Sequence, residues 1–437
     1  MERSLNDPRT LSGWALFDWA NSAFALVITT AIFPPYFEGV VDEAFTVAGL
    51  SFTNSSWFAY LITFSYLVIA LLSPLLSGIA DAGGRRKFFL QLFTTMGGLG
   101  CLSLFFFTSM ETMWIGSLGF IIGLIGFAGG LVFYNSFLPV IATEDRFDRL
   151  SARGFAMGYV GSVLLLILNL AMVQKPEWFG LPAEGTLAVR MAFVTVGIWW
   201  LVFAYVSLSR LPDDVRRPGT GLADMAARGW EEFTSVWRRL TDYPDAKQFL
   251  LAFFCYSAGV QTVIFLASIF AKKELGFETA ELIVVVLILQ IVAIAGAYLA
   301  ARISEARGNR FALYVELIIW TLICVLAYFV NAKVQFYVIA GAVGLVMGGV
   351  QSLSRSTYAK VIPEDREADG TRSDTTSWFS FYDVLEKLAI VLGTFLFGFL
   401  DALTGSMRLS VLILSVFFIA GMLFLSRFRL NRSPAQT

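Results

Sequence analysis

Polar residues along the chain are separated by apolar runs of about 20 residues, the length with which an α-helix crosses a bilayer. Twelve such runs predict an all-α membrane protein with twelve transmembrane helices. The polar start, MERSLNDPRT, lacks the short apolar region and cleavage site of a signal peptide, so the first run is expected to be an uncleaved helix. The predicted spans are residues 13–36, 56–79, 88–108, 113–142, 155–174, 190–208, 247–270, 281–301, 311–331, 335–361, 378–400 and 409–427.

The distribution of basic residues predicts the orientation of these spans. With the N-terminus placed in the cytoplasm, 25 of the 32 Lys and Arg residues fall on the cytoplasmic side, among them Arg149 and Arg153. Six fall on the opposite side, and Lys387 lies inside a span. Because cytoplasmic loops are enriched in Lys and Arg, both termini are expected in the cytoplasm.

A polar segment over residues 209–246 separates six predicted helices from the next six. Within it, apolar residues recur every three or four positions over 222–240, which predicts an amphipathic helix on the inner membrane surface. We interpret it as a linker, with a regulatory or partner-binding role as the alternative. The predicted domains are an N-terminal six-helix bundle (1–208), the linker (209–246) and a C-terminal six-helix bundle (247–437).

Composition narrows the class of protein further. Hydrophobic residues make up 57% of the chain and charged residues 15%, against about 25% charged in an ordinary soluble domain. A net charge of −1 provides no positive electrostatic field that would attract nucleic acid. With so few charged residues, the protein is expected to lie in a lipid bilayer. The chain has no histidine, and its three cysteines form no CxxC pair, so no metal site and no cofactor are expected.

Two short segments in the first half recur in the second half. GIADAGGRRK (78–87) aligns with RISEARGNRF (302–311), and VIATEDR (140–146) aligns with KVIPEDR (360–366). The two offsets, 224 and 220 residues, are nearly equal. They predict a parallel repeat of six helices, an arrangement that places a substrate cavity between the halves near the membrane midplane.

The first of these segments resembles a loop of the major facilitator superfamily, G-x-L-A-D-R-x-G-R-R, between its second and third helices. WALFDWANSAF (14–24) is similar to the signature of the vacuole-effluxer branch, which includes the yeast autophagy-related vacuolar amino-acid exporter and bacterial homologues. FYNSFLP (133–139), GFAMGYVG (154–161) and GGVQSLSRSTYAKVIP (348–363) resemble further signatures of this branch. The chain departs from the branch at 375–389, where acidic and basic residues replace small ones.

The resemblance implies a major facilitator fold and a loop that latches the inner ends of the helices together in the outward-facing state. Carried over to this chain, the latching carboxylate is Asp81. The glycines permit the tight turn, and the arginines can pair with acids of the opposite half. The implied gate residues are Gly78, Asp81, Gly84, Arg85 and Arg86.

Polar side chains inside the spans are the main candidates for function, because they are costly in lipid and usually face a cavity or a partner. Asp18 is expected either to bind a cation or proton or to tie its helix to Arg153. Glu316 is interpreted as structural. The candidates for lining the substrate cavity are Asp18, Asn21, Tyr134, Asn135, Gln261, Gln351, Arg355 and Tyr382.

Charged residues in the tenth and eleventh spans have two interpretations each. Arg355 offers a planar fork that suits a substrate carboxylate or an inner gate formed with Asp383 or Glu386. Asp383 and Lys387 are four residues apart and are expected to pair along the helix. Asp18, Asp383 and Glu386 are the candidates for proton coupling. Glycines in the fourth span, including Gly126 and Gly130, form GxxxG pairs that predict close helix packing.

These features favour a secondary active transporter, not an enzyme, that moves a small solute by alternating access. No ATP-binding P-loop is present, so a gradient is expected to drive transport. The resemblance suggests neutral amino acids as the substrate. An exporter of drugs or other metabolites and a non-transporting membrane sensor are the alternatives. The expected protein is a monomer in a bacterial inner membrane, or in the vacuolar membrane if the chain is fungal.

Overall fold

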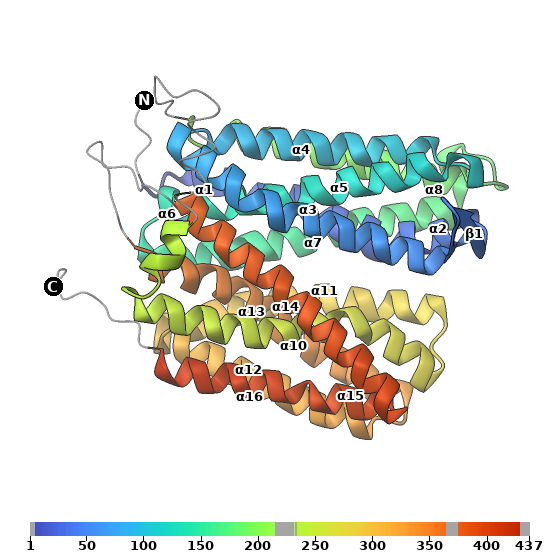
Figure 1. Cartoon of the computed structure of the whole chain (residues 1–437). Helices are drawn as coiled ribbons and strands as arrows, with labels where there is room; N and C mark the ends of the chain where they lie inside the picture. The colour runs from blue at the N-terminus through green and yellow to red at the C-terminus, as the bar shows by residue number, and fades with distance from the viewer. Residues whose placement is uncertain (1–4, 215–230, 232–233, 364–374, 429–437) are drawn as a thin grey trace. The chain divides into compact units, whose positions relative to one another are not determined.

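The computed structural model describes residues 5–214, 231, 234–363 and 375–428, and nearly all of them are helical (Figure 1). Within these ranges, eleven helical segments are long and apolar enough to cross a membrane. α14 (Thr375–Thr404), which carries Asp383, Glu386 and Lys387, completes twelve. The others are formed by α1 (Pro8–Ala23), α3 (Asn54–Gly83), α4 (Arg86–Ser103), α5 (Met113–Ser136), α7 (Phe147–Gln174), α8 (Leu187–Leu208), α10 (Pro244–Leu275), α11 (Thr279–Arg307), α12 (Asn309–Phe329), α13 (Lys333–Val361), and α15 (Met407–Ile413) with α16 (Ser415–Arg427).

The first span departs from the regular helix that the sequence predicts. Asp7 caps α1, since its carboxylate accepts a hydrogen bond of 2.9 Å from Thr10 N. After α1 the chain widens into a π-helix over Phe24–Ile32 and then continues as α2 (Phe33–Val40). Side chains therefore do not follow a 3.6-residue period beyond Phe24.

A short hairpin, which the apolar pattern did not reveal, precedes α3. β1 (Ala44–Val47) pairs with β2 (Leu50–Thr53) in antiparallel register. Ala48 and Gly49, which form the two-residue turn, both have positive φ, as a type I′ turn requires.

α7 begins at Phe147, eight residues before the predicted start at 155. Arg149 and Arg153, which precede the predicted span, are therefore part of the helix. The acidic residue Asp148 lies in its first turn, where the helix dipole favours a negative charge.

The chain forms two compact units. The first comprises Met1–Phe137 and Met157–Trp230, and the second comprises Leu138–Ala156 and Glu231–Thr437. The first turns of α7 thus pack with helices that follow the linker in sequence. The division into domains 1–208, 209–246 and 247–437 stays a prediction, and residues 215–230 and 232–233, which include part of the predicted amphipathic helix over 222–240, lie outside the described residues.

Helix packing within each unit follows one scheme. In the first unit α4 packs on α5 and α8, α1 packs on α8, and α3 packs on α5. In the second unit α12 packs on α13 and α16, α10 packs on α16, and α11 packs on α13. When the six spans of each unit are counted in chain order, the same pairs are packed in both units: third with fourth, third with sixth, first with sixth and second with fourth. This agreement supports the internal repeat of six helices.

Glycines allow these helix pairs to approach to backbone contact. A Cβ added to Gly126 of α5 would lie 2.5 Å from Gly97 Cα of α4, too close for two carbon atoms. In the second unit, a Cβ at Gly344 of α13 would lie 2.6 Å from Leu289 O of α11. Gly130 differs, since its nearest neighbours would be 3.8 Å away. The close packing predicted from the GxxxG spacing is therefore confirmed at Gly126 but not at Gly130.

The N-terminus of α4 is capped by a residue distant in sequence. Asp214 accepts hydrogen bonds from Lys87 N at 2.7 Å and from Phe88 N at 2.9 Å. Burial raises the pKa of the Asp214 carboxyl above its ordinary value, and the two amide donors oppose that rise. The bonds tie the segment after α8 to the start of α4.

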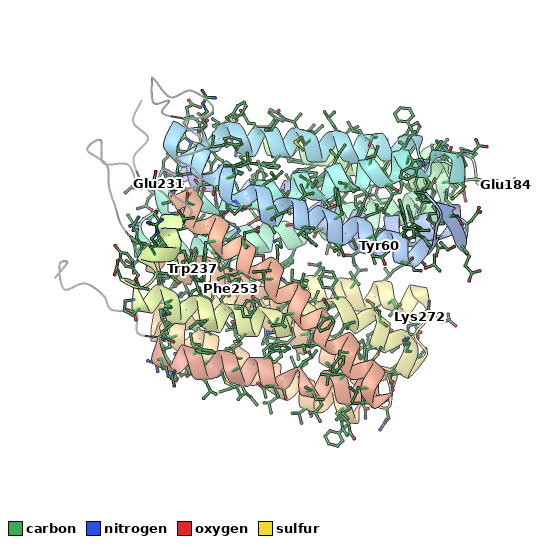
Figure 2. The ribbon with its side chains drawn as sticks, in the orientation of Figure 1. Tyr60, Glu184, Glu231, Trp237, Phe253 and Lys272 are labelled. Carbon is green, nitrogen blue, oxygen red and sulfur yellow. The ribbon has the colours of Figure 1, made fainter. Side chains whose placement is uncertain are left out.

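Many apolar side chains of the helices are exposed. Tyr60 on α3 is 58% exposed, and Leu67 and Leu71 follow it on the same helix. In Figure 2, Tyr60 projects from its helix, whereas Phe253 lies among the side chains inside the second unit. Apolar residues on the outside are expected for helices whose solvent is lipid.

Candidate functional site

In the first unit, Asp18 lies in an aromatic enclosure built by α1 and α5. Its carboxylate is 5% exposed and accepts a hydrogen bond of 2.8 Å from the Tyr134 hydroxyl. The Tyr134 ring stacks on Trp14 with centroids 4.6 Å apart and on Phe17 at 4.7 Å. Trp14 also donates its indole N–H to the Tyr134 carbonyl. Two of the predicted cavity residues, Asp18 and Tyr134, are thus in direct contact.

Asn21, one turn after Asp18, is 2% exposed, and its Oδ1 accepts no hydrogen bond from the described residues. A buried acceptor of this kind usually has a partner, so Asn21 stays a candidate for contact with a substrate donor. Asn135 on α5 and Gln351 on α13 are half-buried. The roles of these residues in binding stay predictions.

The loop between α3 and α4 has the geometry that its glycines predict. Gly84 ends α3 in the left-handed conformation, with φ of 60°, and Arg85 precedes the first residue of α4. Asp81 is 7% exposed and lies 3.5 Å from Arg86, whose guanidinium is 5.5 Å from the Phe137 ring centre. Gly78 is buried on the same helix. The latch function of this loop stays a prediction.

In the second unit, α14 and α10 bring four polar side chains together. Lys387 Nζ lies 2.9 Å from Asp383 Oδ1 and 3.3 Å from Glu386 Oε2. Gln261 on α10 donates to the other Glu386 oxygen at 3.2 Å. The predicted pair along the helix is therefore confirmed. We call Gln261, Asp383, Glu386 and Lys387 the charged cluster.

Aromatic residues adjoin the charged cluster. Tyr382, one residue before Asp383, stacks on Phe253 with centroids 4.0 Å apart and on Tyr358 at 4.8 Å. Tyr256 shares a hydrogen bond of 2.7 Å with Ser354 of α13. The Tyr256 hydroxyl also feels the charge of Glu386. The charged cluster therefore lies next to flat aromatic rings.

Arg355 is 3% exposed and is held by the first turns of α7. Its Nε donates to Ser151 Oγ at 2.9 Å, and a terminal nitrogen donates to Ser151 O at 2.9 Å. The guanidinium also lies 4.2 Å from the centre of the Phe155 ring. These contacts tie part of the guanidinium fork to Ser151 of α7, and the roles of Arg355 in substrate binding or gating stay predictions.

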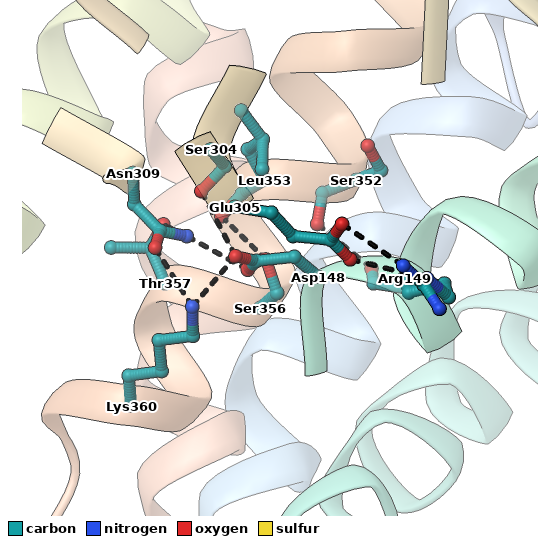
Figure 3. A network of polar contacts seen from close by, with 11 residues as sticks. Asp148, Arg149, Ser304, Glu305, Asn309, Ser352, Leu353, Ser356, Thr357 and Lys360 are labelled. Atoms are coloured by element: carbon teal, nitrogen blue, oxygen red, sulfur yellow. Dashed lines mark hydrogen bonds and ion pairs between the residues drawn. The ribbon is translucent and has the colours of Figure 1, made fainter. Parts of the chain in front are cut away.

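A second buried network involves Asp148, which sequence reasoning missed (Figure 3). Asp148 is 4% exposed and accepts hydrogen bonds from Ser304 at 2.9 Å and from Asn309 at 2.8 Å. It also forms an ion pair with Lys360 at 2.7 Å, and Lys360 in turn donates to Asn309 Oδ1. We call Asp148, Ser304, Asn309 and Lys360 the α7 clamp.

An exposed ion pair flanks the α7 clamp. Arg149 donates two hydrogen bonds, of 3.1 and 3.0 Å, to the two oxygens of Glu305. Asp148 and Arg149 follow one repeated segment, and Ser304, Glu305 and Asn309 lie in another. The repeated segments were thus a signal for this contact, although the repeat alone did not say which residues meet.

Comparisons with known proteins give the family. The family model described as "Vacuole effluxer Atg22 like" matches residues 6–437. The chain belongs to this family. The resemblance stated from the sequence is confirmed.

The protein is also similar to individual transporters. The uncharacterized MFS-type transporter YxiO of Bacillus subtilis is 29% identical over 95% of this chain and 94% of its own. Autophagy-related protein 22 of Saccharomyces cerevisiae is 26% identical over 82% of this chain and 75% of its own.

Solved structures confirm the fold. The human organic anion transporter MFSD10 superposes with a TM-score of 0.72 at 15% identity, covering 97% of this chain and all of its own. The transporter FucP gives a TM-score of 0.71 at 15% identity, covering 98% of this chain and all of its own. The protein is therefore a multi-pass membrane transporter of the major facilitator superfamily, and its relatives are transporters, not enzymes.

Proposed function

We propose that this transporter moves neutral amino acids across its membrane by alternating access. The charged cluster is the observation that carries the proposal. An α-amino acid presents one carboxylate and one ammonium group, and the cluster offers Lys387 to the first and Asp383 or Glu386 to the second. Tyr382 and Phe253 would contact an apolar side chain.

The charges of the cluster are arranged so that a zwitterionic substrate can exchange ion-pair partners with them. Lys387 is bound to both carboxylates, and Asp383 Oδ2 has no partner among the described residues. A substrate ammonium that binds a carboxylate, with the substrate carboxylate on Lys387, conserves the number of ion pairs. Opening the cluster without a substrate leaves buried charges unpaired, which is strongly unfavourable.

The description of the family supports the direction of transport, and the substrate class rests on the resemblance stated from the sequence. The family is described as an effluxer, and we infer amino-acid export from the similarity to Autophagy-related protein 22. We infer export from the cytoplasm or from a storage compartment. We also infer that both termini face the cytoplasm, that the protein is a monomer, and that protons are coupled through Asp18, Asp383 or Glu386.

The experiment is a thermal-shift screen of the purified protein against neutral amino acids, sugars and nucleosides, followed by counterflow in proteoliposomes with the best binder. A ligand that binds the folded state raises the melting temperature by mass action. We expect neutral amino acids to do so and to show saturable counterflow. Lys387→Gln should reduce counterflow at least tenfold, and the exposed Lys272→Gln should leave it unchanged.

Stabilisation by sugars or nucleosides, with none by amino acids, would refute this substrate class. Coupling is tested by Asp18→Asn, which should abolish pH-driven uptake and leave counterflow. If pH-driven uptake persists in this variant, Asp18 does not carry the proton.

A further inference from the structure

Glu316 is a buried carboxyl on α12 of the second unit. It is 7% exposed, and its Oε2 has no hydrogen-bond partner among the described residues. The sequence alone suggested a structural role. A structural carboxylate is normally held by donors or a cation, because an ionised carboxylate without them is strongly unfavourable in apolar surroundings.

The packing around Glu316 is made of small residues. A Cβ added to Gly349 of α13 would overlap Glu316 Oε1 and would lie 2.9 Å from the Cβ of Ala300 on α11. The missing side chain of Gly349 therefore provides the space that the carboxyl occupies. Gly348, next to it, lets α13 contact the backbone of α11 at Ala293. The paired glycines that begin the GGVQSLSRSTYAKVIP segment thus form the Glu316 pocket.

Charged neighbours distinguish Glu316 from the other membrane carboxyls of this unit. Asp383 and Glu386 each lie within ion-pair distance of Lys387. For Glu316, no lysine or arginine of the described part of the chain lies within that distance, whether on α11, α13, α15 or α16, which pack on α12. Among the described residues, Tyr256 of α10 is close enough to Glu316 for an electrostatic interaction between the two groups.

Tyr256 connects this pocket to the charged cluster. Its hydroxyl feels the charges of both Glu316 and Glu386, and it is hydrogen-bonded to Ser354, the residue before Arg355. A change of charge at Glu316 therefore alters the electrostatic balance at a hydroxyl that adjoins the cluster. The connection is electrostatic, so it does not require contact between the two carboxyls.

We infer that Glu316 is a proton-binding site of this transporter, which carries its proton in the resting state and releases it during the cycle. When the carboxyl releases its proton, its charge changes from zero to minus one, and binding of a new proton restores the neutral form. Tyr256 transmits the change to the charged cluster. The inference deepens the proposed function, on which it rests, because it adds a further residue to the proton coupling proposed there.

The first measurement uses infrared spectroscopy and needs no substrate. The reconstituted protein is titrated from acidic to alkaline pH while the C=O stretching band of protonated carboxyls is recorded. We expect a band at neutral pH that declines as the pH rises and that Glu316→Gln removes. Glu111→Gln, which removes an exposed carboxylate, should leave the band unchanged.

The second measurement separates a coupling residue from a neutral structural one. With the amino acid identified by the screen, Glu316→Gln should lose at least tenfold in pH-driven uptake and keep counterflow. Gly349→Ala, which changes no titratable group, should shift the titration of the band because the added methyl group displaces the carboxyl. It serves as the second test if Glu316→Gln fails to fold.

A band that persists in Glu316→Gln would overturn the inference, and so would unchanged pH-driven uptake in a variant that has lost the band. A wild-type protein that transports no tested amino acid, but titrates at Glu316, would instead refute the proposed function and leave the proton site standing.

Discussion

The ion pair between Asp148 and Lys360 in the α7 clamp is expected to be strongly coupled energetically. The two side chains are 5% and 10% exposed, and the charged atoms are 2.7 Å apart. At an effective dielectric constant of 20, this separation corresponds to a Coulomb energy of about 6 kcal/mol before desolvation is subtracted. Asp148→Asn removes the charge but preserves the shape. It leaves the ammonium of Lys360 buried without a counter-ion, so we expect a loss of about 3–5 kcal/mol in stability.

A double-mutant cycle isolates the pair from other effects of each substitution. Lys360→Met alone leaves the Asp148 carboxylate with two neutral donors and should cost about 2–4 kcal/mol, as expected for one broken buried pair. The double variant leaves neither charge buried. It should therefore be more stable than the sum of the single effects predicts, with a coupling energy of about 2–3 kcal/mol.

The assay is reversible unfolding of the purified protein in mixed micelles. The control is the pair of Glu281 and Lys333, which are 2.6 Å apart but are 31% and 39% exposed. Its coupling energy should be only about 0–1 kcal/mol, because water screens an exposed pair. A coupling energy below about 0.5 kcal/mol for Asp148 and Lys360, or one equal to the control, would refute the reasoning from burial.

Three further predictions concern helix packing and buried hydrogen bonds. Gly126→Ala should lower the stability of the first unit by about 1–3 kcal/mol in thermal unfolding, because the methyl group meets the α4 backbone, whereas Gly130→Ala should be neutral or stabilising. Tyr134→Phe should cost about 1–3 kcal/mol, because it removes the hydroxyl that binds Asp18, and an unchanged unfolding midpoint would contradict that role. Asp214→Ala should cost about 1 kcal/mol and accelerate hydrogen exchange at the first amides of α4, and unchanged exchange rates there would show that the cap is unimportant.

Local interactions explain why some of the site could be predicted from the sequence. Asp383 and Lys387 are four residues apart on a helix, so the period of the helix places them together without any knowledge of neighbouring helices. The contact between Asp18 and Tyr134 is different, because the sequence named both residues as cavity candidates but not their bond. Their separation along the chain is 116 residues, and only the packing of α1 on α5 brings them together.

The apolar runs determined the number of helices, because a lipid solvent imposes a length and a composition on each span that can be read locally. The repeated segments indicated the internal repeat, and the signature motifs indicated the family. The tertiary structure decided which helices touch. It placed Asp148 against Lys360 across 212 residues, formed a π-helix over Phe24–Ile32 within the first span, and brought no described cation to Glu316. Such outcomes depend on which side chains other helices bring to a given point, and a single helix's own residues contain no record of those neighbours.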